Sequence, residues 1–369
     1  MSSSPQVNPR RRRMGCRWTA VVFGTAAALL AITATGAPPT FAPGDIVMAT
    51  PKELVLYRAG QRLAAWGERQ RICAGKAGRL WGGTAAAGRV VLRQYQSPTD
   101  VQEWTSPPLG DQLVLAKLLR RGQWIFAVYT IPHEEAPAGP WAEGVAGKER
   151  LAGRWVHVLP FDSAAERFGA PIPLRDLFGR AEMVVRHKKL VSGAPLPKGV
   201  RPNVLYLGLW DAALTPDGTL WLSTQTRLTS YRIGSLPQGL TTILNPARIE
   251  GYGQRSRKID GIVGNYGNNT GICALNDRDL AVVNGNPPGG LTVVNTDSPG
   301  LSRPLSRSIF AQEKQAWGLA PVLALPDQIL VAHRHPQVAG IYRISRATGE
   351  SLGTYAEKVT ATEMVLIQK

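Results

Sequence analysis

Short apolar runs separated by turn residues recur through most of the chain. Residues 44–66 hold three such runs, and residues 79–95, 112–131 and 151–161 continue the rhythm. Runs of this length, bounded by Gly, Pro and Asp, are typical of antiparallel strands joined by tight turns. Strands do not alternate with long helical segments, so a parallel α/β fold is not expected. The pattern therefore predicts an all-β protein.

The clearest unit of this pattern runs from Leu207 to Gly234. It has an apolar strand at residues 212–214, a turn at 216–218, a second strand at 220–222 and a third at 228–233. In the Pro-Asp-Gly turn, proline restricts φ and glycine supplies a positive φ. The unit therefore predicts one blade-like meander of antiparallel strands.

Related units return at residues 271–294 and 317–344, so the repeat starts near residues 211, 271 and 318. A spacing of about 50–60 residues is typical of propellers with loop insertions. Residues 44–369 then hold about six such units. We expect a β-propeller of six blades, each a four-stranded antiparallel sheet, and the irregular spacing leaves seven blades open.

Three stretches that interrupt the repeat are expected to be insertions, at about residues 133–150, 162–204 and 235–268. Within the second, the apolar residues of Leu174–Leu190 have roughly helical spacing. We therefore predict one short helix there.

The segments DAALTPDGTLWLST, TGICALNDRDLAVVNG and WGLAPVLALPDQILVA resemble blades of the NHL and SMP-30/gluconolactonase-like group of six-bladed propellers. The resemblance covers about residues 205–345, and residues 44–66 less clearly. The blade motifs themselves carry information on the fold only, because this architecture hosts binding proteins and enzymes alike.

In SMP-30-like enzymes a divalent metal lies at the top of the central channel, bound by acid and Asn side chains just before the innermost strands. The resemblance implies Asp211 and Asn269 as metal ligands, with Asp260 as an alternative, and oxygen donors of this kind suit Ca²⁺ or another divalent metal. However, Trp317 holds the comparable place in the last clear blade, and no Glu-Gly-Pro stretch lies near the first. The implied metal set is therefore incomplete.

Four other residues are candidates for ligand binding. Trp210 and Trp317 flank innermost strands, where indole rings either stack on a sugar or aromatic ligand or pack in the core. His333 and His335 are two apart in a strand, so both side chains project to one side and could share a metal, or lie at a solvated strand end. No GxSxG, P-loop or GxGxxG motif is present, so the catalytic residues are unknown.

The N-terminus carries the pattern of a targeting segment. Arg10–Arg13 is followed by Trp18–Ala37, a stretch without charge that ends in small residues before Pro38. This is typical of a cleaved signal peptide, and an uncleaved membrane anchor is the alternative. The abundance of Ala, Thr and Gly favours cleavage. We predict export to the periplasm or cell exterior, with residues 38–369 forming a single propeller domain.

The basic charge belongs to the exported part as well. Removing the first 37 residues, which hold five arginines and no acid, lowers the formal net charge from +17 to +12. For an exported protein this favours small acidic molecules or envelope and extracellular anionic polymers over nucleic acid, or serves solubility alone. The clusters Arg186–Lys189 and Arg255–Lys258 could hold such anions or be solvated loops.

Two functions from different classes follow from these patterns. The first is an exported propeller that binds an anionic or carbohydrate ligand over its top face. The alternative is a metal-dependent lactonase or esterase, so the sequence does not decide whether the protein is an enzyme. Cys73 and Cys273 either form a disulfide or are two separate buried thiols, and we favour the thiols because sequence cannot establish disulfide geometry.

Overall fold

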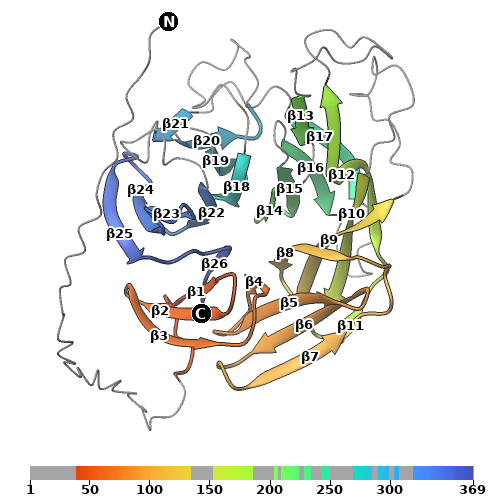
Figure 1. The fold of residues 1–369 in the computed structure, drawn as a ribbon, viewed down its shortest axis with the longest axis horizontal. Coiled ribbons are helices and arrows are strands. Elements are labelled where there is room, and N and C mark those ends of the chain that lie inside the picture. Colours follow the sequence, from red (N-terminus) through yellow and green to blue (C-terminus); the bar gives the residue numbers. More distant parts are fainter. Residues whose placement is uncertain are drawn as a thin grey trace, which may run out of the picture. The chain divides into compact units, whose positions relative to one another are not determined.

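The structure is a computed structural model, and it describes residues 39–133, 153–185, 203–206, 209–223, 228–233, 243–249, 269–284, 290–298, 303–306 and 319–368. In these ranges the chain forms strands and no helix. The strands make six antiparallel sheets that follow one another around a central channel (Figure 1). The chain is therefore a six-bladed β-propeller, which confirms the predicted fold class.

The strands of each blade are given below from the innermost to the outermost. Blade 1 consists of β26 (Glu363–Leu366), β1 (Ile46–Ala49), β2 (Leu54–Arg58) and β3 (Gln61–Trp66). Blade 2 consists of β4 (Arg71–Ala74), β5 (Leu80–Ala86), β6 (Arg89–Tyr95) and β7 (Val101–Thr105). Blade 3 is larger, with β8 (Val114–Arg121), β9 (Trp124–His133), β10 (Gly153–Asp162), β12 (Ile172–Val185) and β13 (Asn203–Tyr206), and with β11 (Arg167–Phe168) paired to β10.

The other three blades contain the repeats recognised in the sequence. Blade 4 consists of β14 (Asp211–Leu214), β15 (Thr219–Ser223), β16 (Leu228–Ile233) and β17 (Ile243–Ile249). Blade 5 consists of β18 (Asn269–Ala274), β19 (Asp279–Asn284), β20 (Gly290–Asn295) and β21 (Arg303–Ser306). Blade 6 consists of β22 (Leu319–Ala324), β23 (Gln328–His333), β24 (Gly340–Ser345) and β25 (Ser351–Glu357). The predicted repeat starts coincide with the first strands of these blades.

Blade 1 closes the ring with strands from both ends of the chain. The C-terminal strand β26 pairs antiparallel with β1, with Val47 opposite Val365. This pairing ties the two ends of the ring together by backbone hydrogen bonds. The blade could not be recognised as one repeat because its strands are not contiguous in sequence.

Hydrophobic clusters fill the spaces between neighbouring blades. In β1, Ile46 and Met48 belong to the cluster shared with blade 6, whereas Val47 and Ala49 belong to the cluster shared with blade 2. Alternate residues of a strand point to opposite faces, so a middle strand must be apolar on both faces. The outermost strand β3 is mostly exposed. Burial thus decreases from the inner strands to the rim of the blade.

The Pro-Asp-Gly turn of blade 4 has the predicted geometry. Gly218 has a φ of 91°, which glycine adopts without the steric cost that a Cβ would bring. The carboxylate of Asp217 accepts a hydrogen bond from the Thr219 amide at 3.0 Å, which closes the turn before β15. The turn prediction is confirmed.

The predicted helix at Leu174–Leu190 is wrong over the residues that the structure describes. Residues 174–185 belong to β12, which pairs with β10 and with β13. Helical spacing of apolar residues is a weak signal, and pairing with two neighbouring strands overrides it. Leu174 is buried in the cluster between blades 3 and 4, where its burial favours the strand.

The expected insertions also contain blade strands. The stretch at 162–204 includes β11 and β12, and the stretch at 235–268 includes β17. Residues 134–150 lie outside the described part of the chain, as does the N-terminal segment with its predicted signal peptide or anchor. Among the residues that are described, no helix has the length and apolar character needed to cross a membrane.

Candidate functional site

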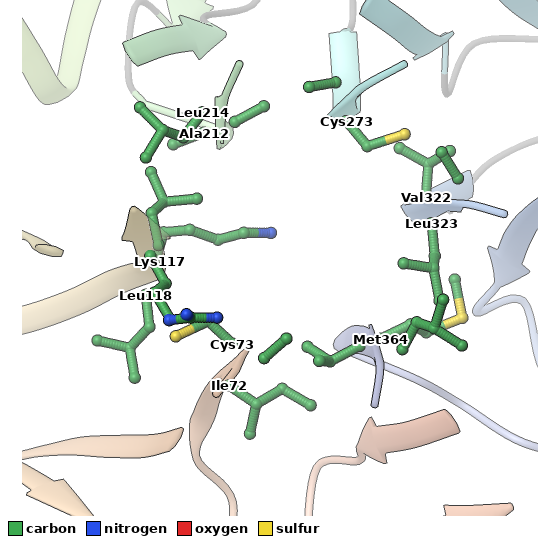
Figure 2. Close-up of a pocket in the computed structure, with 18 of the residues that line it drawn as sticks. Ile72, Cys73, Lys117, Leu118, Ala212, Leu214, Cys273, Val322, Leu323 and Met364 are labelled. Atoms are coloured by element: carbon green, nitrogen blue, oxygen red, sulfur yellow. The ribbon is translucent and has the colours of Figure 1, made fainter. Parts of the chain in front are cut away.

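A channel runs through the centre of the ring and is lined by the six innermost strands: β26, β4, β8, β14, β18 and β22. Its cavity volume is about 300 Å³. Small side chains such as Ala212, Ala274 and Cys73 keep this space open, because larger ones would fill the axis (Figure 2). This channel is therefore the first candidate for a ligand site.

The innermost strands all begin at the same end of this channel, which we call the top face. The second strand of each blade runs antiparallel to the innermost strand. The end of β23, which pairs with β22, therefore also lies at the top face. Residues at the start of an innermost strand, or at the end of the second strand, are therefore brought together there. The opposite end, where the innermost strands finish, is the bottom face.

Lys117 and Asp211 form an ion pair inside the top of the channel. The Lys117 Nζ lies 2.7 Å from Asp211 Oδ1, and the two side chains are 16% and 9% exposed. Figure 2 shows the lysine side chain reaching from β8 into the open centre. Asp211 also accepts hydrogen bonds from the backbone amides of Ala212 at 2.9 Å and Ile272 at 3.0 Å. Both carboxylate oxygens are therefore engaged.

The electrostatics of Lys117 follow from this arrangement. Burial by itself lowers the pKa of the ammonium group, because it penalises the charged form. The carboxylates of Asp211 and Glu363, with the hydrogen bond to Asp211, outweigh burial, so the pKa of Lys117 is raised above its ordinary value. Lys117 is therefore a protonated cation at neutral pH, not a nucleophile.

Glu363 and Arg71 form a second ion pair at the same level. Arg71 Nη1 lies 3.0 Å from Glu363 Oε1, and Glu363 is 2% exposed. The other oxygen, Oε2, accepts the backbone amide of Ile72 at 2.7 Å. Arg71 Nε donates to the Leu115 carbonyl at 3.1 Å. The pair thus joins blade 1 to blade 2, and its arginine reaches blade 3.

Arg334 adds a further cation beside these pairs. It follows β23, and its Nε donates to the Ala361 carbonyl at 3.2 Å, two residues before Glu363. Although Arg334 keeps contact with solvent, partial desolvation lowers the pKa of its guanidinium; Asp211 opposes this effect and Arg71 adds to it. Among the described residues, Arg334 forms no ion pair with a carboxylate.

We call these groups the top-mouth cluster, and its members share the top end of the channel and act on one another electrostatically: Arg69, Arg71, Lys117, Arg334, Asp211 and Glu363. Arg69, two residues before β4 begins, is exposed and also contributes to lowering the pKa of Arg334. Four basic groups face two carboxylates. The cluster therefore has an excess of positive charge after both carboxylates are paired.

Of the implied metal ligands, Asp211 belongs to the top-mouth cluster. Asp211 and Asn269 each begin an innermost strand, so their backbones lie at the same end of neighbouring strands β14 and β18. A lysine ammonium already pairs with Asp211, in the position that a divalent cation would need. No group of three His, Cys, Asp or Glu side chains suited to a metal occurs among the described residues. A metal at Asp211 would have to displace the Lys117 ammonium.

The other candidate residues lie in different environments. Trp210 is 44% exposed beside the start of β14, at the top face. His333 is fully buried and its Nδ1 accepts the His335 amide at 3.0 Å. The two imidazole centroids are 6.2 Å apart and nearly perpendicular. Trp317 lies outside the described residues, as do Asp260 and the two predicted basic clusters.

The two described cysteines are free thiols. Cys73 in β4 and Cys273 in β18 line opposite sides of the channel, so they do not form a disulfide (Figure 2). Burial raises the pKa of each thiol to about 12. Both are therefore protonated and poorly nucleophilic at neutral pH.

Several residues of the site escaped sequence analysis. Arg71 and Glu363 start innermost strands just as Asp211 does, so the same positional rule could have found them once blades 1 and 2 were recognised. Lys117 follows an irregularity in the register between Leu115 and Lys117, which no sequence signal predicts. Its role depends on the position of the bulge.

Comparison with known proteins supports the fold. No protein-family model and no curated protein matches the chain. Among solved structures, a chain of the nidogen/laminin complex has a TM-score of 0.50 and 10% sequence identity over 87% of this chain and 97% of that chain. Apo AztD from Citrobacter koseri has a TM-score of 0.43 and 11% identity over 89% of this chain and 98% of that chain.

A Bacteroides uniformis protein provisionally named a 6-phosphogluconolactonase has a TM-score of 0.43 and 11% identity over 87% of this chain and 99% of that chain. At 10% identity, the similarity to the chain of the nidogen/laminin complex supports the fold alone. The fold is shared by proteins of different functions, so the residues at the channel must carry any functional argument.

Proposed function

We propose that this chain is an exported β-propeller that binds an anionic ligand at the top end of its channel. The observation that supports the proposal most directly is the positive excess of the top-mouth cluster. Arg71 and Lys117 are neutralised by Glu363 and Asp211, whereas Arg334 has no carboxylate partner among the described residues. An added anion would supply that partner.

The geometry favours an oxyanion such as a carboxylate, phosphate or sulfate. A guanidinium group presents planar pairs of donors that match two oxygens of such groups. Arg334 is held by one bond from Nε to Ala361, which leaves its terminal nitrogens for a ligand at the face. Partial desolvation at the mouth strengthens the attraction relative to open water.

The anionic group belongs either to a small molecule or to an anionic polymer of the envelope or cell exterior. The N-terminal segment supports export, and the net charge of +12 without the first 37 residues supports a broad attraction to anions. If the segment is cleaved, purified protein has the mass of a chain shortened by about 37 residues. If it is retained, the protein stays with the membrane fraction.

Binding of inorganic phosphate and dextran sulfate to the purified protein tests the proposal. Arg334→Gln should weaken binding about tenfold, the effect of losing one charge-assisted contact. Arg343→Gln is the matched control. Arg343 lies away from the top mouth and its Nε donates to the neutral Gln328 side chain, so this substitution also removes one positive charge but not from the proposed site. Equal effects of the two variants, or no binding by the unmodified protein, would overturn the proposal.

A carbohydrate ligand is a second candidate because Trp210 is exposed at the same face. An exposed indole ring offers a surface on which a sugar can stack, and a sugar acid would also engage the arginines. A glycan array tests this directly. Silence on the array, or binding unchanged by Trp210→Ala, would reject the carbohydrate version while leaving the anion version intact.

The metal-dependent hydrolase stays a prediction. It would require the Lys117 ammonium to leave Asp211, and it would require further oxygen ligands beyond those described here. Metal analysis of purified protein, with a thermal shift in the presence of a chelator, tests it. Absence of both bound metal and a shift would exclude the hydrolase.

A further inference from the structure

Two large apolar side chains are exposed at the top face of the described part of the chain. Val114 is 50% exposed at the first residue of β8, and Trp210 is 44% exposed directly before β14. Both therefore stand at the start of an innermost strand, beside the channel mouth. The other exposed large apolar side chains that the structure describes lie on the outermost strands β3, β7 and β25: Leu63, Val101 and Leu352.

Val114 and Trp210 belong to neighbouring blades, and their backbones are held in place. β8 and β14 are adjacent innermost strands in the ring (Figure 1). Val114 pairs with a residue of β9, and the Trp210 amide donates to a carbonyl of β15 at 2.8 Å. Lys117 and Asp211, further along the same two strands, form the ion pair that joins them. Val114 and Trp210 therefore form an apolar side of the mouth, above that pair.

The exposed arginines lie on other blades around the mouth. Arg334 follows β23 in blade 6, and Arg69 precedes β4 in blade 2. Desolvation lowers the pKa of the Arg334 guanidinium, and the charge of Asp211 opposes this effect, so these two groups interact across the mouth. Because Trp210 is the neighbour of Asp211 in the chain, a small molecule is long enough to contact both Trp210 and Arg334.

We propose that the anion bound at the top mouth is a small aromatic carboxylate. Its ring stacks on Trp210 and contacts Val114, and its carboxylate pairs with Arg334. Asp111, which is exposed three residues before β8, disfavours the opposite orientation, because like charges repel. The ligand class rests on the proposed function, because the same site and the same arginine bind the anion.

The chemistry of the apolar side favours an aromatic ring over a sugar. An indole face offers area for stacking in either case. The Val114 side chain has no hydrogen-bonding group, so a sugar hydroxyl placed against it would lose contact with water without a replacement bond. The edge of a phenyl ring carries only C–H groups and has no such cost. A molecule with an aromatic ring and a carboxylate therefore matches the apolar side and Arg334 together.

Three probes separate the two contacts: 3-phenylpropanoate carries the ring and the carboxylate, propanoate lacks the ring, and 3-phenylpropanamide lacks the charge. Calorimetric titration of the full chain should show 3-phenylpropanoate binding about tenfold more tightly than either of the other two. Trp210→Ala should remove the advantage over propanoate, and Arg334→Gln should remove the advantage over the amide.

A pair of valines gives a matched control. Val114→Ser should weaken binding of 3-phenylpropanoate about threefold, because it replaces an apolar contact with a hydroxyl. Val101 is 47% exposed, but it lies on the outermost strand β7, so Val101→Ser should leave the affinity unchanged. Equal effects of the two substitutions would contradict the apolar contact.

The outcomes distinguish the ligand class from the anion site itself. Trp210→Ala should leave phosphate binding unchanged, because phosphate contacts only the basic groups. Phosphate binding that depends on Arg334, together with equal affinity for 3-phenylpropanoate and propanoate, would refute the aromatic ligand and leave the anion site standing. Absence of binding of phosphate and of all three probes would refute both. Glucuronate binding as tightly as 3-phenylpropanoate, with an equal loss of the two in Trp210→Ala, would assign the site to a sugar acid and also refute the aromatic ligand.

Discussion

The ion pair between Arg71 and Glu363 is expected to stabilise ring closure, and Glu363→Gln tests this. The substitution keeps the size of the side chain and removes its charge. Glu363 is 2% exposed and its two oxygens accept from Arg71 Nη1 at 3.0 Å and the Ile72 amide at 2.7 Å. Removing one partner of a buried pair costs about 3–5 kcal/mol. Since Arg71 is 28% exposed and can be rehydrated, we expect about 3 kcal/mol.

Urea unfolding followed by tryptophan fluorescence measures this loss. Glu53→Gln is the control: its pair with Arg62 has a similar N–O distance of 2.9 Å, but the two side chains are 38% and 57% exposed. Pairs in solvent contribute at most about 1 kcal/mol. The double variant Arg71→Met/Glu363→Met should lose less free energy of unfolding than the sum of the losses in Arg71→Met and Glu363→Met, because no unpaired buried charge remains in it.

A cost of less than about 1 kcal/mol for Glu363→Gln, comparable to that of the surface control, would refute the reasoning. Strict additivity in the double variant would show that the two side chains do not act as a pair.

Three further predictions concern the channel and the core. The pKa of Lys117 is raised in the folded chain, so its contribution to stability is complete below the unfolded-state pKa of about 10.4 and is lost as pH rises through the folded value. Lys117→Met should therefore flatten the fall in urea midpoint at alkaline pH, and parallel curves would contradict this. Since the pKa of both Cys73 and Cys273 is raised to about 12, Ellman's reagent at pH 8 should label neither in the native protein and both after unfolding; rapid native labelling would contradict the raised pKa values. Phe126→Ala, at a fully buried site between blades 3 and 4, should cost about 3–5 kcal/mol in urea unfolding, and a loss near zero would contradict the described packing.

Local pattern in the sequence predicts the strands and the repeated blade well. The turn at Pro216–Gly218 and the start of the repeat at Asp211 depend on neighbouring residues, whose preferences are readable in order along the chain. The failure at Leu174–Leu190 has the opposite cause: strand pairing with β10 and β13 decides the conformation, and no neighbouring residue encodes it.

The candidate site was only partly readable because its members are distant in sequence. Asp211 was identified by its place before an innermost strand, but its partner Lys117 comes from blade 3 and became visible only when the blades were arranged in space. Trp210 lies next to the start of β14, and its exposure, which bears on the choice between stacking and core packing, belongs to the tertiary structure.

Ring closure explains why the sequence did not reveal the ion pair between Arg71 and Glu363. Arg71 and Glu363 are separated by 292 positions, yet pairing of the last strand with the first brings them to 3.0 Å. Residue pattern alone predicts an all-β chain with repeated meanders, a basic surface and an N-terminal targeting segment. Only the closed ring decides which charges meet, because strand ends that are far apart along the chain converge on one axis.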